Sequence, residues 1–439
     1  MTHLKPASPS LLPSLIAVTL IITALGGNCR MRGTTGDQIV AEQPKNTTDK
    51  SAINHRPIAI DMHADTAQRM VDEGVDINRR LPDGQLDAVR MKEGGLTAQF
   101  FSIWVEPEYF GLGGRTAMER ADRQIAAVRA LAEKHPETWE LATTAADIRR
   151  IAGEGKLAAL MGLEGGYAID EKLQNVERYF QMGVRYLSPT WSVSTSWAGS
   201  SGDAAGQTRG LNDFGRAVIR EMNRLGMMVD VSHVSDRTFW DIIHTSTEPV
   251  IATHSGARSL VNVPRNLDDE QLRALARTGG VCCVIFYPAF IEPGWAEKQK
   301  RVDTEITPLV EAASRASQGT PSQKKIARDR VREREYARRL PPVSVARIAD
   351  QIDHVVKIAG IDAVGIGSDF DGIQAVPRDL ASVADLPNLT AELARRGYSA
   401  ADIAKILGGN ILRVMEAVQA HSAISSQTGE EHDDARTGR

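Results

Sequence analysis

The chain has 439 residues, of which 42% are hydrophobic and 25% charged, a composition ordinary for a soluble globular protein. A formal net charge of −4 argues against the basic composition typical of proteins that bind nucleic acid or an anionic membrane surface, so we expect no nucleic-acid partner. With only three cysteines and no Cys-x-x-Cys pair, the sequence predicts neither a disulfide framework nor a zinc finger.

Residues 1–28 predict an export signal. A weakly positive start is followed by an apolar run from Leu11 to Leu25, too short to span a membrane comfortably, and then by two glycines. Cys29 follows as in a bacterial lipoprotein signal, although Asn28 stands where a small residue is usual. A lipid anchor at Cys29 and a plain cleaved signal are both left open. Either way we expect an exported protein, periplasmic or extracellular, with membrane anchoring only through that lipid.

Between residues 57 and 420, short apolar runs alternate with amphipathic helical patterns. The runs that predict buried strands are Ile58–Met62, Thr97–Val105, Leu157–Leu163, Val184–Leu187, Met227–Ser232, Pro249–Thr253, Gly280–Phe286 and Ala363–Ser368. Helices are predicted at Asp213–Leu225, Asp268–Ala276 and Val343–Ala359. Strands alternating with helices in this way predict an α/β fold, a (β/α)8 TIM-like barrel. An open doubly wound sheet is the competing arrangement, but no glycine-rich nucleotide-binding motif supports it.

Three segments depart from this alternation. Residues 29–56 are polar and predict a linker, and residues 421–439 predict a disordered tail. Between the last two predicted strands, Ala296–Arg339 is charged and helical in character. Its basic run, from Lys324 to Arg332, is interleaved with acidic residues, which we interpret as the solvent-exposed face of a helix.

Side chains that bind metals fall at the carboxyl ends of the predicted strands. His63 and Asp65 follow the first strand and, being two residues apart, point the same way. The other candidates are Glu164 after the third strand, His233 after the fifth, His254 after the sixth and Asp369 after the eighth. Because a barrel gathers these strand ends at one mouth, we expect them to share a metal site there.

Imidazoles together with carboxylates suit zinc, and also manganese or cobalt. Five ligands are more than one catalytic zinc needs, whereas two metals bridged by a carboxylate use them all. The predicted assignment is His63 and Asp65 on one Zn²⁺, His233 and His254 on the other, and Glu164 as the bridge. Two ions about 3.5 Å apart would clamp a hydroxide and polarise a carbonyl. Asp369 would then carry a proton from the bridging water to the leaving amine.

The motifs together resemble the membrane (renal) dipeptidase family of dizinc metallopeptidases, from about Ile58 to Val418. The matching segments are Asp61–Thr66, Leu163–Gly166, Asn223–Gly226, Asp230–Ser235, Thr253–Ser255, Arg265–Asn266 and Gly367–Gly372. The resemblance implies hydrolysis of dipeptides, with a D-residue at the carboxyl end as an option. It implies the same five zinc ligands, Asp369 as the proton-handling carboxylate, and Arg265 as the residue that holds the substrate's carboxylate with its guanidinium fork.

The sequence departs from this family at two expected substrate-binding positions. Trp191 stands after the fourth strand, where the family commonly has a histidine, and Tyr167 stands where a histidine often follows Glu-Gly-Gly. Tryptophan offers one N–H donor and no proton to exchange at neutral pH. A related amide or ester hydrolase that acts on N-acyl amino acids or lactones is therefore the alternative, and an inactive binding protein is a third hypothesis. A homodimer is left open.

Overall fold

A computed structural model of the chain describes residues 57–107, 109 and 114–420. The predicted signal (1–28), linker (29–56) and tail (421–439) lie outside these residues, and so does Cys29. Within the described part of the chain, no helix combines the length and apolar character that a membrane crossing requires.

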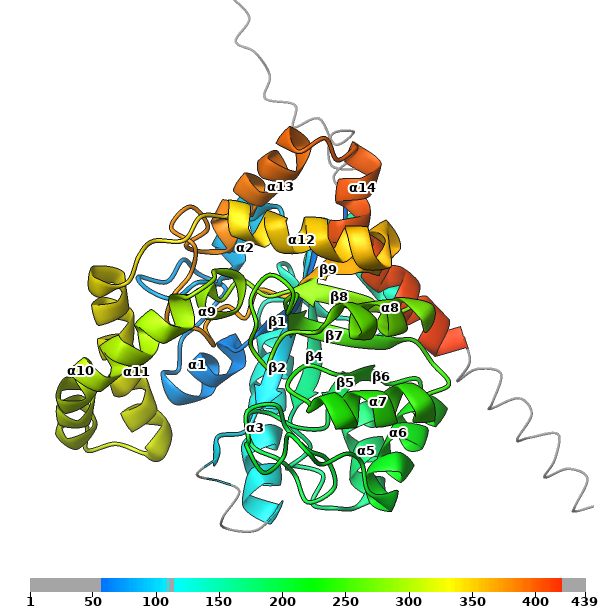
Figure 1. The fold of residues 1–439 in the computed structure, drawn as a ribbon, viewed down its shortest axis with the longest axis horizontal. Helices are drawn as coiled ribbons and strands as arrows, with labels where there is room; N and C mark the ends of the chain where they lie inside the picture. The colour runs from blue at the N-terminus through cyan, green and yellow to red at the C-terminus, as the bar shows by residue number, and fades with distance from the viewer. Residues whose placement is uncertain (1–56, 108, 110–113, 421–439) are drawn as a thin grey trace, which may run out of the picture. The chain divides into compact units, whose positions relative to one another are not determined.

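Eight parallel strands close into a barrel (Figure 1). In their order around the ring they are β1 (Ile60–Ala64), β2 (Ala98–Trp104), β4 (Leu157–Glu164), β5 (Val184–Ser188), β6 (Met228–Asp230), β7 (Val250–Ser255), β8 (Val281–Val284) and β9 (Val364–Ile366). β2 pairs directly with β4, and β9 returns to β1 with Ile366 opposite Asp61. The predicted (β/α)8 barrel is confirmed, and the open-sheet alternative is wrong.

One strand was not predicted. β3 (Trp139–Leu141) pairs with the first residues of β4, on the edge that β5 occupies further along. It spans three residues, WEL, which is too short to show the alternation by which a strand is recognised. It lies at the start of β4, away from the strand's carboxyl end.

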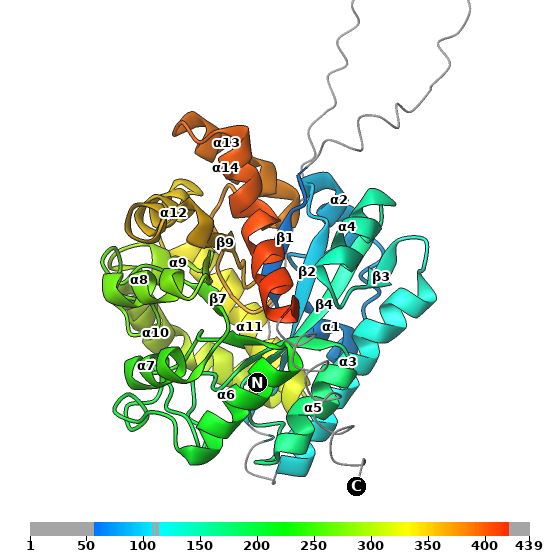
Figure 2. The same ribbon diagram turned by 90° about the vertical axis from the view of Figure 1, so that its right-hand side faces the viewer.

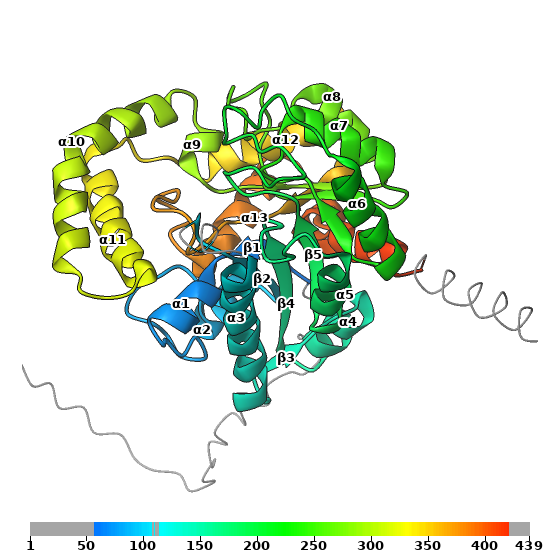
Figure 3. The same cartoon turned by 90° about the horizontal axis from the view of Figure 1, so that it is seen from below.

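Helices surround the barrel in the positions expected of βα units (Figures 1 and 3). They are α1 (Thr66–Asp72), α2 (Ala88–Gly94), α3 (Gly114–Lys134), α4 (Ala145–Gly153), α5 (Leu173–Gln181), α6 (Asp213–Leu225), α7 (Asp236–Thr245), α8 (Asp269–Arg277), α9 (Pro288–Ile291), α10 (Trp295–Ala316), α11 (Pro321–Arg339), α12 (Ala346–Ala359), α13 (Leu386–Arg395) and α14 (Ala400–Ala404). The chain continues as a π-helical turn, Lys405–Gly409, and then stays helical to residue 420.

Helix α6 shows how local sequence sets an element. The side chain of Asn212 accepts a hydrogen bond from the Gly215 N–H at the start of the helix. Val218 and Met222 recur at helical spacing and are buried against the barrel. Gly226 ends the helix in the left-handed region, at φ 77°, where a side chain would be strained. The predicted bounds of this helix, Asp213–Leu225, are confirmed.

The barrel interior is filled with side chains below the mouth. Ile60, Phe100 and Tyr186 pack there in one buried cluster with Leu412 and Met415 of the last helix. Figure 2 shows that helix crossing the end of the barrel. Each fully buried aliphatic or aromatic side chain stabilises the fold by about 1.5–3 kcal/mol. The strands finish at the opposite end of the barrel, which this helix leaves uncovered.

The adjacent cysteines Cys282 and Cys283 lie in β8 and are both buried and unpaired, in agreement with the absence of a predicted disulfide framework. Alternate strand residues face opposite sides, so Cys283 joins the cluster inside the barrel and Cys282 the cluster between strands and helices. They act as small core residues.

The charged excursion Ala296–Arg339 forms the helical hairpin of α10 and α11, which projects to one side of the barrel beside α1 and α9 (Figure 3). The helical prediction is confirmed, but the interpretation of its basic run as wholly solvent-exposed is wrong. The Lys325 side chain is only 29% exposed, and its ammonium lies over the ring of Trp104. Periodicity alone could not show that a charged helix face would turn towards the mouth of the barrel.

Candidate metal centre

Three imidazoles converge on the carboxylate of Glu164 at the end of β4. His63 Nε2 lies 3.1 Å from Glu164 Oε2. His233 Nε2 and His254 Nε2 lie 2.9 and 3.6 Å from the other oxygen, Oε1, and 2.9 Å from each other. The two oxygens of one carboxylate thus face different histidines, which is the arrangement that a bridging ligand needs.

Asp65 and Asp369 lie on the His63 side of the cluster. One ligand atom from each of His63, Asp65 and Asp369 falls within 4.8 Å of the others, as do atoms of His63, Glu164 and His254. Asp65 directly follows β1 and precedes the first residue of α1. Asp369 lies three residues beyond β9, and its N–H donates to the His63 carbonyl at 3.0 Å. The fold therefore gathers all five predicted ligands and Asp369 at one mouth.

Steric constraints explain why residue 372, in the last motif, is a glycine. A Cβ on Gly372 would lie 2.1 Å from Asp65 Oδ2 and 2.5 Å from Asp369 Oδ1. Only a residue without a side chain lets the backbone approach both carboxylates so closely.

Crowding of charges perturbs the pKa values in this cluster. Burial lowers the pKa of His63, but the charge and hydrogen bond of Glu164, together with the charges of Asp65 and Asp369, raise it to about 10. Burial, with the nearby charge of Arg265, lowers the pKa of His233 to about 4. Burial raises the pKa of Asp65 to about 7 and that of Asp369 well above its usual range, and neighbouring carboxylates add to both. The charges of His63, Lys325 and Arg265 offset only part of this crowding, since the pKa values of both aspartates stay raised, and a bound cation would offset more of it.

Unsatisfied oxygen and nitrogen atoms in the cluster also suit the binding of divalent cations. Asp65 Oδ1 is buried without a hydrogen-bond partner among the described residues. The Nε2 atoms of His233 and His254 face one another and the same carboxylate oxygen, so lone pairs converge where a positive charge would satisfy them. Imidazole and carboxylate donors suit zinc, manganese or cobalt. A bound cation would therefore satisfy these nitrogen and oxygen atoms better than hydrogen bonds among the residues themselves.

Hydrogen bonds behind the cluster orient His63. Its Nδ1 lies 3.0 Å from the buried Tyr186 hydroxyl. Its backbone N–H donates to Asp61 Oδ1 at 3.3 Å. The same carboxylate accepts from the Ser368 N–H at 2.7 Å and the Ser368 hydroxyl at 2.6 Å, next to Asp369. Asp61 thereby ties the strand that carries His63 to the residue before Asp369.

A matching network orients His254. Its Nδ1 lies 2.8 Å from Thr253 Oγ1. The Thr253 hydroxyl donates to Asp230 Oδ2 at 2.8 Å, and Ser188 also donates to that oxygen. Because the hydroxyl proton goes to Asp230, Thr253 Oγ1 accepts from His254 Nδ1–H. The lone pair of this imidazole is therefore at Nε2, which faces the cluster.

His233 occupies a strained backbone position at φ 70°, in the left-handed region. Its carbonyl accepts hydrogen bonds from the Ser201 N–H at 2.8 Å and the Ser201 hydroxyl at 3.0 Å, and from the Ser200 hydroxyl at 3.2 Å. Ser200 also donates to the Trp191 carbonyl. The loop after β5 thus fixes both His233 and Trp191, whose rings lie 6.2 Å apart between centroids.

The predicted substrate-binding residues differ in how many of their polar atoms are already hydrogen-bonded. Arg265 Nη1 donates to the Ser255 hydroxyl at 2.9 Å, while its buried Nε and Nη2 have no partner among the residues described. The Tyr167 hydroxyl accepts from the Trp191 N–H at 3.1 Å and donates to the Val193 carbonyl. Tyr167 therefore supports the loop that carries Trp191, whereas Arg265 has donors left for a ligand.

Sequence reasoning missed several supporting residues. Tyr186, Thr253 and Asp230 orient imidazoles, and the Ser102 hydroxyl donates to Glu164 Oε2 at 2.7 Å. The sequence could have revealed the role of Asp61, since Asp61 precedes His63 by two residues and so shares its strand face. It could not have revealed Ser102 and Tyr186, because they reach the cluster from strands β2 and β5, which show no ligand motif.

A parallel (β/α)8 barrel that gathers imidazoles and carboxylates at the carboxyl ends of its strands defines a metal-dependent hydrolase. The profile of the membrane dipeptidase family (peptidase family M19) matches residues 48–428. The chain belongs to this family of metallopeptidases, and membership implies bound metal ions.

Individual relatives agree with this assignment. The chain is 31% identical over 340 residues to dipeptidase 3 of Rattus norvegicus, covering 76% of this chain and 59% of the rat protein. The fold is similar to the crystal structure of the probable dipeptidase PvdM from Pseudomonas aeruginosa, with a TM-score of 0.72 and 27% identity, covering 85% of this chain and 98% of that one. A metallopeptidase from Rhodobacter sphaeroides, liganded with a phosphinate mimic of the dipeptide L-Ala-D-Ala, shares the fold at a TM-score of 0.67 and 24% identity, covering 83% and 99% of the two chains.

Proposed function

We propose that the protein hydrolyses dipeptides with the help of two divalent cations, zinc in the first place and manganese or cobalt as alternatives. The observation that carries this proposal is Arg265. Its guanidinium is buried beside the cluster, and two of its nitrogens lack a partner among the described residues. A buried, under-satisfied guanidinium calls for an anion, and the free carboxylate of a short peptide matches its geometry.

The roles of the other residues follow from their positions. Glu164, His63, Asp65, His233 and His254 would hold the cations. Bound there, the cations would polarise the scissile carbonyl and activate a water. Asp369 lies within the same cluster but is left over from the ligand assignment. We assign it the proton transfer from the attacking water to the leaving amine.

A second candidate function rests on Trp191. Its ring packs edge-on against Trp104, with centroids 4.9 Å apart, on the His233 side of the mouth. An indole there gives one N–H and an apolar wall in place of an imidazole. Such a wall suits the acyl group of an N-acyl amino acid or the ring of a lactone, the alternative substrates on the same centre.

The test is turnover by zinc-loaded protein on a panel of L-L and L-D dipeptides, N-acyl amino acids and lactones, with metal content measured on the same preparation. We expect cleavage of dipeptides, and a preference for L-D members would support the D-residue option. Two bound metals with no dipeptide cleaved would contradict the proposal, and cleavage of acyl amino acids or lactones instead would favour the second candidate.

Asp369→Asn separates chemistry from metal binding. We expect unchanged metal content and a fall in kcat of about 10²–10⁴, the usual size of a general acid–base contribution. Glu164→Gln is the matched control, because loss of the central carboxylate should lower metal content as well. Full activity of Asp369→Asn would refute its assigned role.

We propose export through residues 1–28, with the location of the mature protein decided by Cys29. Fractionation of cells that express the wild type and Cys29→Ser, with labelled palmitate, tests both steps. Label on the wild type alone identifies a lipoprotein. Unlabelled protein in the periplasm or medium identifies a plain cleaved signal, and protein retained in the cytoplasm would contradict export. Sedimentation of the same preparations distinguishes a monomer from a homodimer.

A further inference from the structure

We propose that Lys325 and Trp104 form a subsite that accepts an acidic side chain on the amino-terminal residue of the substrate. This inference rests on the proposed dipeptidase function and names a substrate class for it: dipeptides that begin with glutamate or aspartate.

A row of rings leads from the metal cluster to Lys325. The His233 ring lies 6.2 Å from Trp191, and Trp191 packs edge-on against Trp104 at 4.9 Å, between centroids. The Lys325 ammonium lies 5.4 Å from the centroid of Trp104. This distance is within the range of a cation–π contact, which holds the ammonium in place while leaving N–H groups to donate.

The barrel topology gives the direction of the substrate. In the closed ring of eight strands, β2 stands opposite β7. Arg265 comes from the loop after β7, and Trp104 is the last residue of β2. A dipeptide whose carboxylate binds Arg265 and whose amide lies at the cluster therefore directs its amino-terminal residue towards Trp104 and Lys325.

The local charge favours an anion. Lys325 pairs with Asp329 at 2.8 Å, but Asp329 is shared with Arg332 at 2.9 Å, so the three side chains together carry one net positive charge. Glu106, the nearest acid after β2, is already held by two hydrogen bonds from Arg120. The carboxylate of Asp65 also acts on the Lys325 ammonium, but the proposed function assigns Asp65 to a cation. With Asp65 and Glu106 so engaged, Lys325 is a half-buried cation with charge left for a ligand.

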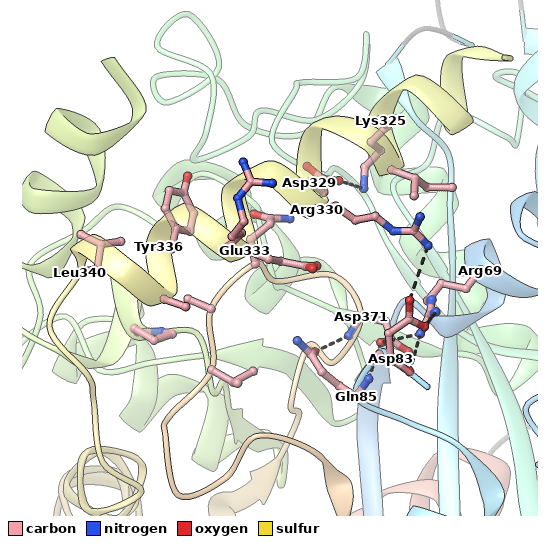
Figure 4. Close-up of a pocket in the computed structure, with 18 of the residues that line it drawn as sticks. Arg69, Asp83, Gln85, Lys325, Asp329, Arg330, Glu333, Tyr336, Leu340 and Asp371 are labelled. Atoms are coloured by element: carbon pink, nitrogen blue, oxygen red, sulfur yellow. Dashed lines mark hydrogen bonds and ion pairs between the residues drawn. The ribbon is translucent and has the colours of Figure 1, made fainter. Parts of the chain in front are cut away.

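There is also room for a charged side chain. Lys325 and Asp329 line a cavity of about 790 Å³ between α11, α1 and the loop after β9 (Figure 4). On the facing wall, Arg69 is already paired with Glu73 at 2.9 Å and Asp83 at 2.6 Å. Lys325 thus lies between this cavity and Trp104, and it is the cavity cation that contacts that ring. The volume is within the usual range of ligand pockets.

The experiment compares two isosteric substrates, Glu-Ala and Gln-Ala, each with L- and D-alanine. For the wild type we expect kcat/KM to favour Glu over Gln by about five- to tenfold, the size of one charge-assisted hydrogen bond at a half-exposed site. Lys325→Met should bring the ratio near one, and Lys325→Arg should restore part of it. Lys324→Met is the matched control, because Lys324 precedes Lys325 on the same helix and does not line the cavity.

A second measurement keeps this inference separate from the proposed activity. Ketomethylene isosteres of Glu-Ala and Gln-Ala cannot be hydrolysed at the replaced amide, and their binding to metal-loaded protein is measured by calorimetry. The same ratio of Kd values, lost in Lys325→Met, would support the subsite even if neither dipeptide is cleaved. Equal or weaker binding of the glutamate isostere to the wild type, or an unchanged preference in Lys325→Met, would overturn it.

Discussion

At the scale of single residues, the orientation of one hydroxyl decides which nitrogen of an imidazole can bind metal. Thr253 donates to Asp230 and therefore accepts from His254 Nδ1, which leaves Nε2 free to face the cluster. Tyr186 stands in the corresponding position behind His63. Partners of this kind hold ligands in the correct tautomer and commonly matter nearly as much as the ligands themselves.

This network predicts that Thr253→Val will weaken metal binding by about 10–100-fold, since valine keeps the β-branched shape but removes the hydroxyl. Affinity is measured by competition with a chromophoric chelator. Thr253→Ser, which keeps the hydroxyl, should bind metal nearly as well as the wild type. Equal affinity of the valine and serine variants would show that the hydroxyl does not orient His254, and the melting temperatures of the metal-free variants report any general loss of stability.

Trp191 gives a second prediction at this scale. Trp191→His should gain activity on ordinary dipeptides, because an imidazole at that place can donate to the oxygen of the tetrahedral intermediate, an interaction commonly worth about 10²–10³ in rate. Initial rates on the dipeptide panel measure the gain. An unchanged or lower rate would mean that Trp191 belongs to a differently built pocket. Its packing on Trp104 would then be part of that pocket.

At the scale of elements, a buried arginine supports the contact between the barrel and the α10–α11 hairpin. Arg120 of α3 is fully buried and forms ion pairs with Asp72 and Glu106 at 2.6 and 2.7 Å. Glu106 also accepts from the Ser322 hydroxyl at the start of α11, at 3.1 Å. The Arg120 guanidinium thus links α1 to the end of β2, and Glu106 in turn links them to the hairpin that carries Lys325.

Arg120→Met should lower the free energy of unfolding by about 3–5 kcal/mol, because it leaves two carboxylates buried without their cation. Chemical denaturation measures the loss. Arg123→Met provides the control, since Arg123 is exposed on the same helix and its replacement should change stability by less than about 0.5 kcal/mol. Similar stability of the two variants would mean that Arg120 does not fasten the hairpin.

Elements with strong local signals could be predicted from the sequence, and those set by distant contacts could not. The eight barrel strands and α6 have apolar runs, caps and a terminal glycine that agree with one another. β3 exists only through its pairing with β4. The inward turn of Lys325 depends on where the hairpin docks, which the periodicity of a charged helix does not record.

At the scale of the whole molecule, the cluster concentrates negative charge in the barrel mouth. The carboxylate of Glu164 is buried, those of Asp65 and Asp369 are partly buried, and burial raises the pKa of Asp65 and Asp369. The folded protein therefore carries an electrostatic cost that cation binding would relieve. Because the unfolded chain holds these ligands apart, bound metal should stabilise the fold.

Removal of metal with a chelator should lower the melting temperature by several degrees, and added zinc should restore it. Differential scanning calorimetry follows both steps. Glu164→Gln should show a much smaller response to zinc, since the central carboxylate of the cluster is lost. A melting temperature indifferent to zinc in the wild type would argue against a metal site in this mouth.

The pairing of β1 with β9 has a consequence for biosynthesis. His63 lies on the first strand of the ring and Asp65 directly follows it, while Asp369 follows the last strand, so the centre lies where the first and last strands pair. A nascent chain that has not yet reached residue 364 can hold five of the six cluster residues, yet it lacks the strand that joins the two edges. Assembly of the complete centre is therefore a late event in folding, coupled to the pairing of the final strand with the first.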